Sequence, residues 1–85
     1  MELKELFEQA VAQSKTLPSK PDNEILLKLY SLFKQSTEGD VNEDEPSNPF
    51  DFVAKAKYTA WQSQKGKTKD ASMQEYVDLV NSLKG

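Results

Sequence analysis

The stretch LLKLYSLFKQSTEGD, residues 26–40, predicts the helix around which the rest of the chain is organised. Tyr30, Phe33 and Lys34 stand three and four positions apart, so a helix presents all three on one face. Gly39 follows them and can take the left-handed conformation that commonly ends a helix. Two aromatic rings beside an ammonium group form a surface that suits a flat, anionic ligand.

Three other helices are predicted by apolar residues that recur at helical spacing. The first has the stripe Leu3, Leu6, Phe7, Ala10 and Val11. The third begins after Asp51 as N-cap, runs to about residue 64, and is expected to turn inward Phe52, Val53, Ala56, Ala60 and Trp61. The fourth begins after Thr68 as N-cap and has the stripe Met73, Tyr76, Val77, Val80 and Leu83. The fold class expected is all-α, with four helices in one domain of residues 1–85.

Proline and glycine mark the connections between these helices. Pro18 and Pro21 end the first helix, because proline lacks an amide donor and restricts the residue before it. The second helix is then predicted from about residue 22 to residue 37. Residues 40–50 read DVNEDEPSNPF, a polar segment with two prolines, which we expect to cross the molecule as a surface connection. Gly66 separates the third helix from the fourth.

Composition excludes several classes of function. The chain has 85 residues, a net charge of -3, eleven lysines and no arginine, so nucleic-acid binding is not expected. It has no cysteine, which removes disulfides and thiolate metal sites and favours a reducing, cytoplasmic location. No apolar run approaches the ~20 residues of a membrane span, and the N-terminus lacks the apolar core of a signal peptide. We therefore expect no stable insertion into a membrane.

The chain also lacks the usual residues of catalysis. It has no histidine and no cysteine, and therefore neither the commonest general base nor the commonest nucleophile. Its three glycines are isolated, so there is no glycine-rich phosphate loop, and the acidic residues at 38–45 do not follow the spacing of an EF-hand. Residues 52–69 carry five lysines and no acid, which leaves a locally basic segment in an acidic chain. Binding is the function that remains.

Each aromatic residue has a plain structural explanation as well. An aromatic side chain at helical spacing lies more often in the core than in a ligand site, and a lysine is more often simply exposed. Tyrosine differs from phenylalanine because a buried hydroxyl needs a hydrogen-bond partner, so Tyr30 and Tyr76 are better candidates than Phe33 for a polar role.

At these residues the sequence strongly resembles the acyl-CoA-binding protein family, also known as diazepam-binding inhibitor. The matching segments are LYSLFKQSTEGDVN at 29–42, KAKYTAW at 55–61, KGKTKDAS at 65–72 and MQEYVDLV at 73–80, with Pro46 between the first two. The resemblance implies a four-helix bundle with up-down-down-up topology. It further implies non-catalytic binding and intracellular transport of long-chain fatty acyl-CoA, with no cofactor and no metal.

In that family a lysine near the end of the first helix, a Y-x-x-[YF]-K segment, the second lysine of the KAK motif and the tyrosine of the fourth helix contact the coenzyme head group. The matching positions here are Lys15, Tyr30, Ser31, Leu32, Phe33, Lys34, Lys57 and Tyr76. Leu26, Leu27 and Val53 are candidates for lining the path of the acyl chain.

The chain departs from the family pattern in four places. Phe33 stands where the family often has tyrosine, Tyr58 where it often has tryptophan, and Val53 at or near a frequent lysine, while the SNPF segment at 47–50 is one residue longer than usual. These departures bear on chain-length preference and affinity more than on the class of ligand.

The first hypothesis is therefore a monomeric, non-enzymatic acyl-CoA carrier. The second hypothesis is a helical module whose aromatic face packs on a partner helix. Such a module would not need several lysines to converge on one concave spot, whereas a phosphate ligand would. A weak thioesterase is the third.

Overall fold

Four helices make up most of the computed structural model, which describes residues 2–84. They are α1 (Leu3–Ser14), α2 (Asn23–Glu38), α3 (Phe52–Gln62) and α4 (Lys69–Leu83). No strand occurs among these residues, and no helix within them is long and apolar enough to cross a membrane. The expected all-α class is confirmed.

The starts of three helices are fixed by polar side chains, as local capping rules require. The side chains of Asp22, Asp51 and Thr68 each accept a hydrogen bond, at 3.0, 3.0 and 3.1 Å, from the amide three residues later. Asp51 and Thr68 are the N-caps predicted from the sequence. At its other end α2 stops at Gly39, whose φ of +83° is a conformation that other residues rarely adopt.

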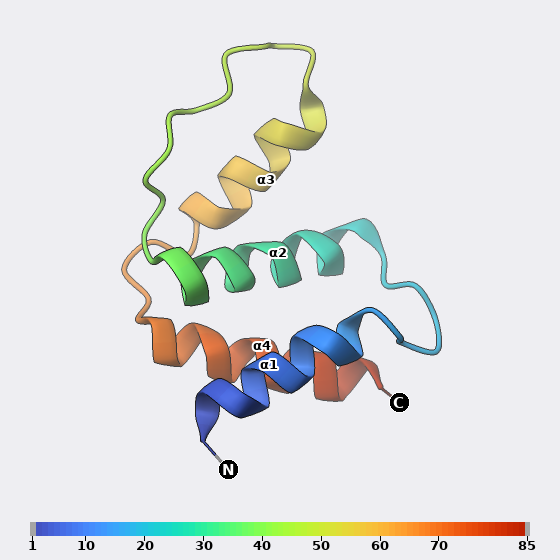
Figure 1. Ribbon diagram of the computed structural model, residues 1–85. Coiled ribbons are helices and arrows are strands. Elements are labelled where there is room, and N and C mark those ends of the chain that lie inside the picture. The colour runs from blue at the N-terminus through green and yellow to red at the C-terminus, as the bar shows by residue number, and fades with distance from the viewer. Residues whose placement is uncertain (1, 85) are drawn as a thin grey trace.

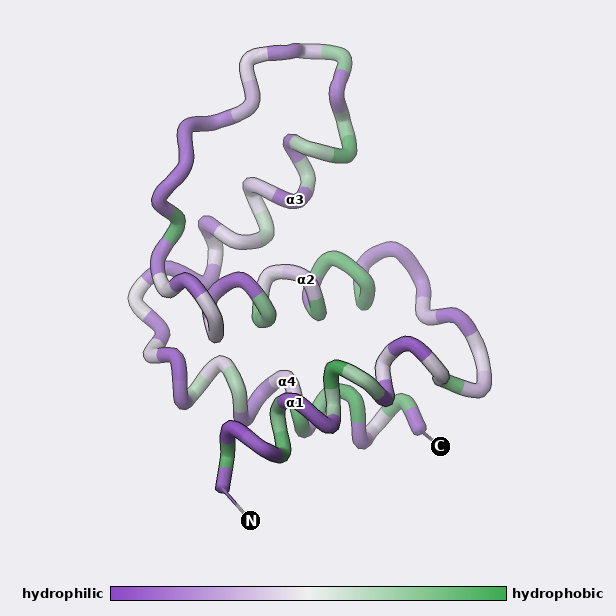
Figure 2. The backbone as a smooth tube through the Cα atoms, viewed as in Figure 1, coloured by the Kyte–Doolittle hydropathy of each residue, from purple (hydrophilic) through white to green (hydrophobic). Residues whose placement is uncertain are grey.

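The helices follow an up-down-down-up order (Figure 1). α2 runs against α1, α3 runs in the same general direction as α2, and α4 returns alongside α1. Close backbone approach joins α1 to α4, α4 to α2 and α2 to α3, and no other pair of the described helices comes as close. The chain between α2 and α3 arches away from the helices and is hydrophilic over most of its length (Figure 2), which confirms the predicted surface connection.

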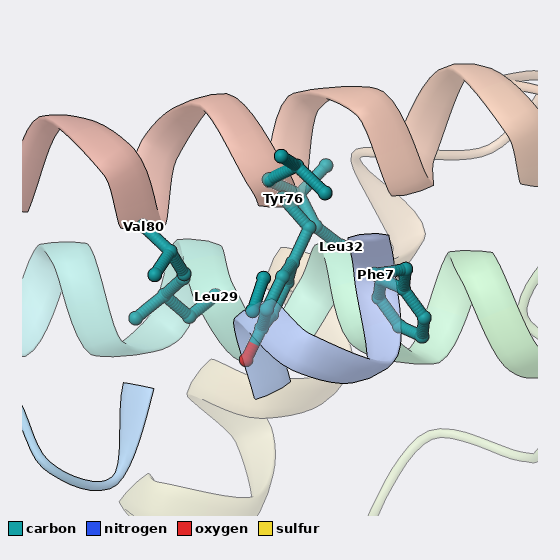
Figure 3. Packing of buried hydrophobic residues seen from close by; sticks show 7 residues of the cluster. Phe7, Leu29, Leu32, Tyr76 and Val80 are labelled. Atoms are coloured by element: carbon teal, nitrogen blue, oxygen red, sulfur yellow. The ribbon is translucent and has the colours of Figure 1, made fainter. Parts of the chain in front are cut away.

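The core lies between α1, α2 and α4. It is a single cluster of buried side chains: Phe7, Ala10, Leu29, Leu32, Tyr76, Val77 and Val80. Figure 3 shows members of this cluster from all three helices pointing toward one another. Helix α3 contributes none of them. Its one buried residue is Trp61, 1% exposed, whose indole N–H donates to the carbonyl oxygen of Gly39 at 2.9 Å.

The prediction that Phe52 and Val53 turn inward is wrong. Their side chains are 73% and 66% exposed, and Phe50 just before them is 82% exposed. The reason is tertiary, because α3 has only α2 as a close neighbour, and its first turn rises away from the α1, α2 and α4 layer (Figure 1). The apolar stripe of α3 is therefore fully covered only near its end, at Trp61.

A polar junction attaches the end of α3 to the end of α2. The amide nitrogen of Gln35, whose side chain is fully buried, donates to the Asp40 carboxylate and to the Lys67 carbonyl oxygen, each at 2.8 Å. The backbone N–H of Gly66 donates to the same carboxylate at 2.8 Å. These donors, Gly66 first and then Gln35, hold the pKa of Asp40 below the ordinary carboxyl range. The junction thus attaches the turn after α3 to the end of α2.

Candidate functional site

An apolar groove of about 320 Å³ lies between α2 and α3. Its lining residues are Asn23, Leu26, Leu27, Tyr30, Phe52, Val53, Ala56 and Lys57. It exists because α3 meets α2 without a third helix to fill the angle between them. Leu26, Leu27 and Val53, the three residues expected to line an acyl path, all line this groove. Such a slot suits an extended hydrocarbon better than a compact polar molecule.

Tyr30 and Lys57 form the polar end of the groove. The ammonium group of Lys57 lies 5.3 Å from the centroid of the Tyr30 ring, which is cation–π geometry. Both residues also line a smaller pocket of about 170 Å³, together with Glu43, Asp44, Pro46, Ala54, Tyr58 and Trp61. The two cavities therefore share one boundary, and that boundary carries a positive charge and a phenol.

Lys34 lies one helical turn beyond Tyr30. Its ammonium group is 4.8 Å from the centroid of the Trp61 ring and forms an ion pair with Glu38. The hydrogen bond to Glu38 raises the pKa of Lys34 above its ordinary value, against the smaller opposing effect of partial burial. Lys34 is therefore a positive charge that is paired with a carboxylate of its own helix and lies against the Trp61 ring of α3.

Phe33 faces another part of the molecule. Its ring stacks on Phe7, with the centroids 6.0 Å apart and the planes 24° from parallel, and its side chain is 37% exposed. It lines a wide, shallow cavity of about 570 Å³ over α1, α2 and α4, whose other residues are Lys4, Phe7, Glu8, Val11, Ser36, Thr37, Lys69 and Met73. Phe33 thus offers an aromatic surface separate from the groove at Tyr30.

Tyr76 is 4% exposed and belongs to the core. Its ring packs edge-on against Phe7 at 5.1 Å, and its hydroxyl group makes a 3.2 Å hydrogen bond with the hydroxyl group of Ser14. The bond holds the last turn of α1, which is followed by Lys15. Lys15 is exposed, and no hydrogen bond or ion pair joins its side chain to another described residue.

Ser31 and Leu32 are buried, with exposed fractions of 1% and 0%. The Ser31 hydroxyl group donates to the Lys28 carbonyl oxygen at 2.8 Å and accepts from the Gln64 amide at 3.2 Å. Leu32 therefore packs in the core, and Ser31 attaches the turn after α3 through Gln64. Their assignment to the ligand site stays a prediction.

The structure brings Tyr30, Lys34 and Lys57 to the α2–α3 boundary and leaves Lys15, Phe33 and Tyr76 on the side of α1. Two further residues at this boundary, Glu38 and Trp61, are not among the site residues predicted from the sequence. Glu38 belongs to the acidic residues at 38–45, but its position four residues after Lys34 is also the spacing of a helical ion pair. Trp61 is predicted to lie in the core, and only the packing of α3 against α2 shows that its ring also contacts the Lys34 ammonium group. No group of three or more metal-ligating side chains occurs within residues 2–84.

Comparison with known proteins gives a consistent result. Residues 4–80 match the family model described as "Acyl CoA binding protein". The chain is 49% identical over 77 residues to acyl-CoA-binding protein homolog 1 of Caenorhabditis elegans, covering 91% of this chain and 88% of that protein. It is 42% identical over 83 residues to acyl-CoA-binding protein of Gossypium hirsutum, covering 98% and 92% respectively. The crystal structure of Oryza sativa acyl-CoA-binding protein 2 matches with a TM-score of 0.90 and 38% identity, covering 96% of this chain and 90% of that one.

Proposed function

The chain belongs to the acyl-CoA-binding protein family, and we propose that its α2–α3 groove and the lysines beside it are the ligand site through which it acts. The protein binds long-chain fatty acyl-CoA esters, leaves them chemically unchanged and serves as their carrier. The observation that supports this site most directly is the groove itself, which is apolar along its length and ends at Tyr30 and Lys57. This polarity matches a hydrocarbon chain joined to an anionic head group.

The apolar part of the groove would hold the acyl chain. Each buried methylene contributes about 0.8 kcal/mol, so several methylenes along Leu26, Leu27 and Val53 can outweigh any one polar contact. Leu26 and Val53 are 37% and 66% exposed, so a bound chain would remove apolar surface from water on both walls.

The lysines would hold the phosphates of coenzyme A. Lys34 and Lys57 stand at the same boundary of α2 and α3, each above an aromatic ring, and lysine binds phosphate as a point charge. Lys15 is free to reach a phosphate from the end of α1. The hydroxyl group of Tyr30 is a further donor at this boundary.

Phe33 would be the platform for adenine. It lies three residues from Tyr30, less than one turn or about 5 Å along the helix, so an extended head group can reach both residues. Stacking of a base on an aromatic ring contributes roughly 1–3 kcal/mol in nucleic-acid complexes, and the same physics applies to adenine here. Tyr76 would contribute through its contact with Ser14, which fixes the end of α1 beside Lys15.

We further propose that residues 1–85 act as one monomeric binding unit in the cytoplasm, without a nucleic-acid partner. The net charge of -3 and the absence of arginine support the last point, and the absence of cysteine agrees with a reducing compartment.

Calorimetric titration tests the proposal. The ligands are acyl-CoA esters of graded chain length, free coenzyme A and a free fatty acid of the longest chain used. Affinity should rise with chain length, free coenzyme A should bind weakly but measurably, and the fatty acid should bind far more weakly than its ester. Equal affinity for the ester and the fatty acid would show that the lysines do not read the head group.

A further inference from the structure

Lys34, one of the lysines proposed to bind a phosphate, already forms an ion pair with Glu38. The Lys34 side chain is 19% exposed and the Glu38 side chain 39% exposed, so the pair lies at the surface of the site, where a ligand can reach it. The centroid of the Trp61 ring also lies 4.8 Å from this ammonium group. A phosphate that approaches Lys34 therefore meets a carboxylate already bound there.

The stability of α2 gives no reason for a glutamate at this position. Glu38 is the last residue of the helix, where the partial negative charge of the helix C-terminus disfavours a carboxylate. The order lysine then glutamate four residues later is also the weaker orientation of a helical ion pair. A surface ion pair of this kind contributes little to folding. What the ion pair does change is the surroundings of the Lys34 ammonium group, which it holds beside a carboxylate.

We propose that Glu38 is an internal competitor for the phosphate, which holds Lys34 in the ligand-free protein and must release it when acyl-CoA binds. This inference rests on the function proposed above and assigns to Glu38 a role in affinity and selectivity. A phosphate monoester such as the ribose phosphate carries about -1.5 to -2 charges at pH 7, and the two groups of the pyrophosphate carry about one each, whereas a free carboxylate carries one in all. Either phosphate therefore competes with Glu38 for Lys34 better than a ligand carboxylate does. Glu38 thus helps the site to reject free fatty acids.

The test is the variant Glu38→Gln, which keeps the size of the side chain and removes its charge. Its affinity for palmitoyl-CoA should exceed that of the unaltered protein by about 1.5- to 5-fold, the range that corresponds to the free energy of an exposed ion pair. Its thermal midpoint should be unchanged or slightly higher, because a carboxylate has been removed from a helix C-terminus. Glu5→Gln is the matched control, since Glu5 is exposed in the first turn of α1 and the same charge change there should leave affinity unaltered.

A double-mutant cycle shows whether Glu38 acts through Lys34. In the Lys34→Gln background, the change Glu38→Gln should no longer tighten binding. Repeating the titrations with palmitoyl-dephospho-CoA identifies the phosphate: tightening for both ligands assigns Lys34 to the pyrophosphate, and tightening for palmitoyl-CoA alone assigns it to the ribose phosphate.

Three results would overturn the inference. Weaker binding by Glu38→Gln would mean that Glu38 positions Lys34 for the ligand, unchanged binding would mean that the pair opens without cost, and tightening that persists without Lys34 would mean a general charge effect. The proposed function fails separately, through failure of the unaltered protein to bind palmitoyl-CoA.

Discussion

The two sides of α2 differ in what covers them. One side carries Leu29 and Leu32, 7% and 0% exposed, and packs with α1 and α4 (Figure 3). The other carries Leu26, 37% exposed, and Tyr30, and faces α3 across an open groove. A single helix therefore supplies apolar side chains to a closed core and to a binding surface. The apolar side chains of α2 that the core does not bury are therefore the ones available to a ligand.

The largest effect is expected from a pair of leucines on the two sides of α2. Leu32→Ala removes a fully buried side chain and should lower the free energy of unfolding by about 2–5 kcal/mol, because it leaves a cavity. Leu26→Ala should cost much less stability and should weaken binding of long-chain acyl-CoA, since Leu26 lines the groove. Urea denaturation and calorimetric titration of both variants measure the two effects. Equal losses of stability would mean that the two sides of α2 are not distinct.

The attachment of α3 should be separable from the core. Trp61→Phe deletes the indole N–H and leaves the Gly39 carbonyl oxygen without that donor, at a cost of about 1–3 kcal/mol. The loss should fall on α3, so hydrogen exchange should accelerate in residues 52–62 while the amides of α2 and α4 around Leu32 and Val80 keep their protection. Uniform acceleration across all four helices would instead show that α3 and the core unfold as one unit.

The polar end of the groove should affect binding far more than stability. Lys57→Ala removes an exposed ammonium group that contacts the Tyr30 ring and forms no hydrogen bond or ion pair with another described residue, so the free energy of unfolding should change by less than about 1 kcal/mol. Affinity for both palmitoyl-CoA and free coenzyme A should fall about tenfold or more, because a charged hydrogen bond to phosphate is lost. Lys28→Ala is the control, as Lys28 is exposed on α2 and lines neither the groove nor the adjoining pocket. A loss of affinity with the ester alone would place Lys57 beside the acyl chain.

Local rules predicted most of the closed side from sequence. The stripe of α4 and the N-caps Asp51 and Thr68 depend on residues within one or two helical turns, and the structure confirms them. The exposure of Phe52 and Val53 depends on which helices surround α3, and spacing along α3 carries no information about that. Apolar residues recur at the same helical spacing whether or not other helices cover them.

The candidate site was predictable to the extent that its residues share a helix or a family motif. Tyr30 and Lys34 had to lie near each other because they are four residues apart, but the approach of Lys57 depends on the packing of α3 against α2. Burial of Gln35 could not be foreseen, because glutamine is usually exposed on a helix and one of its partners, Lys67, lies 32 residues later. The same contact attaches the turn that follows α3 to the end of α2.

The smallest effect is expected from Asp40, whose carboxylate lies in the polar junction between the end of α2 and the turn after α3. The pKa of Asp40 is lowered in the folded protein by the Gly66 N–H and the Gln35 amide, so the unfolded chain binds a proton at a higher pH than the folded one. The stabilisation from Asp40 is therefore complete above about pH 5 and is lost as pH falls through the folded pKa. Asp40→Asn keeps an acceptor for the Gly66 N–H but does not titrate. The difference in thermal midpoint between the unaltered protein and Asp40→Asn should thus be constant from pH 5 to 7 and shrink below about pH 4. A difference that stays constant down to pH 2 would show that the charge of Asp40 does not hold α3 to the core, and that the hydrogen-bond geometry alone does.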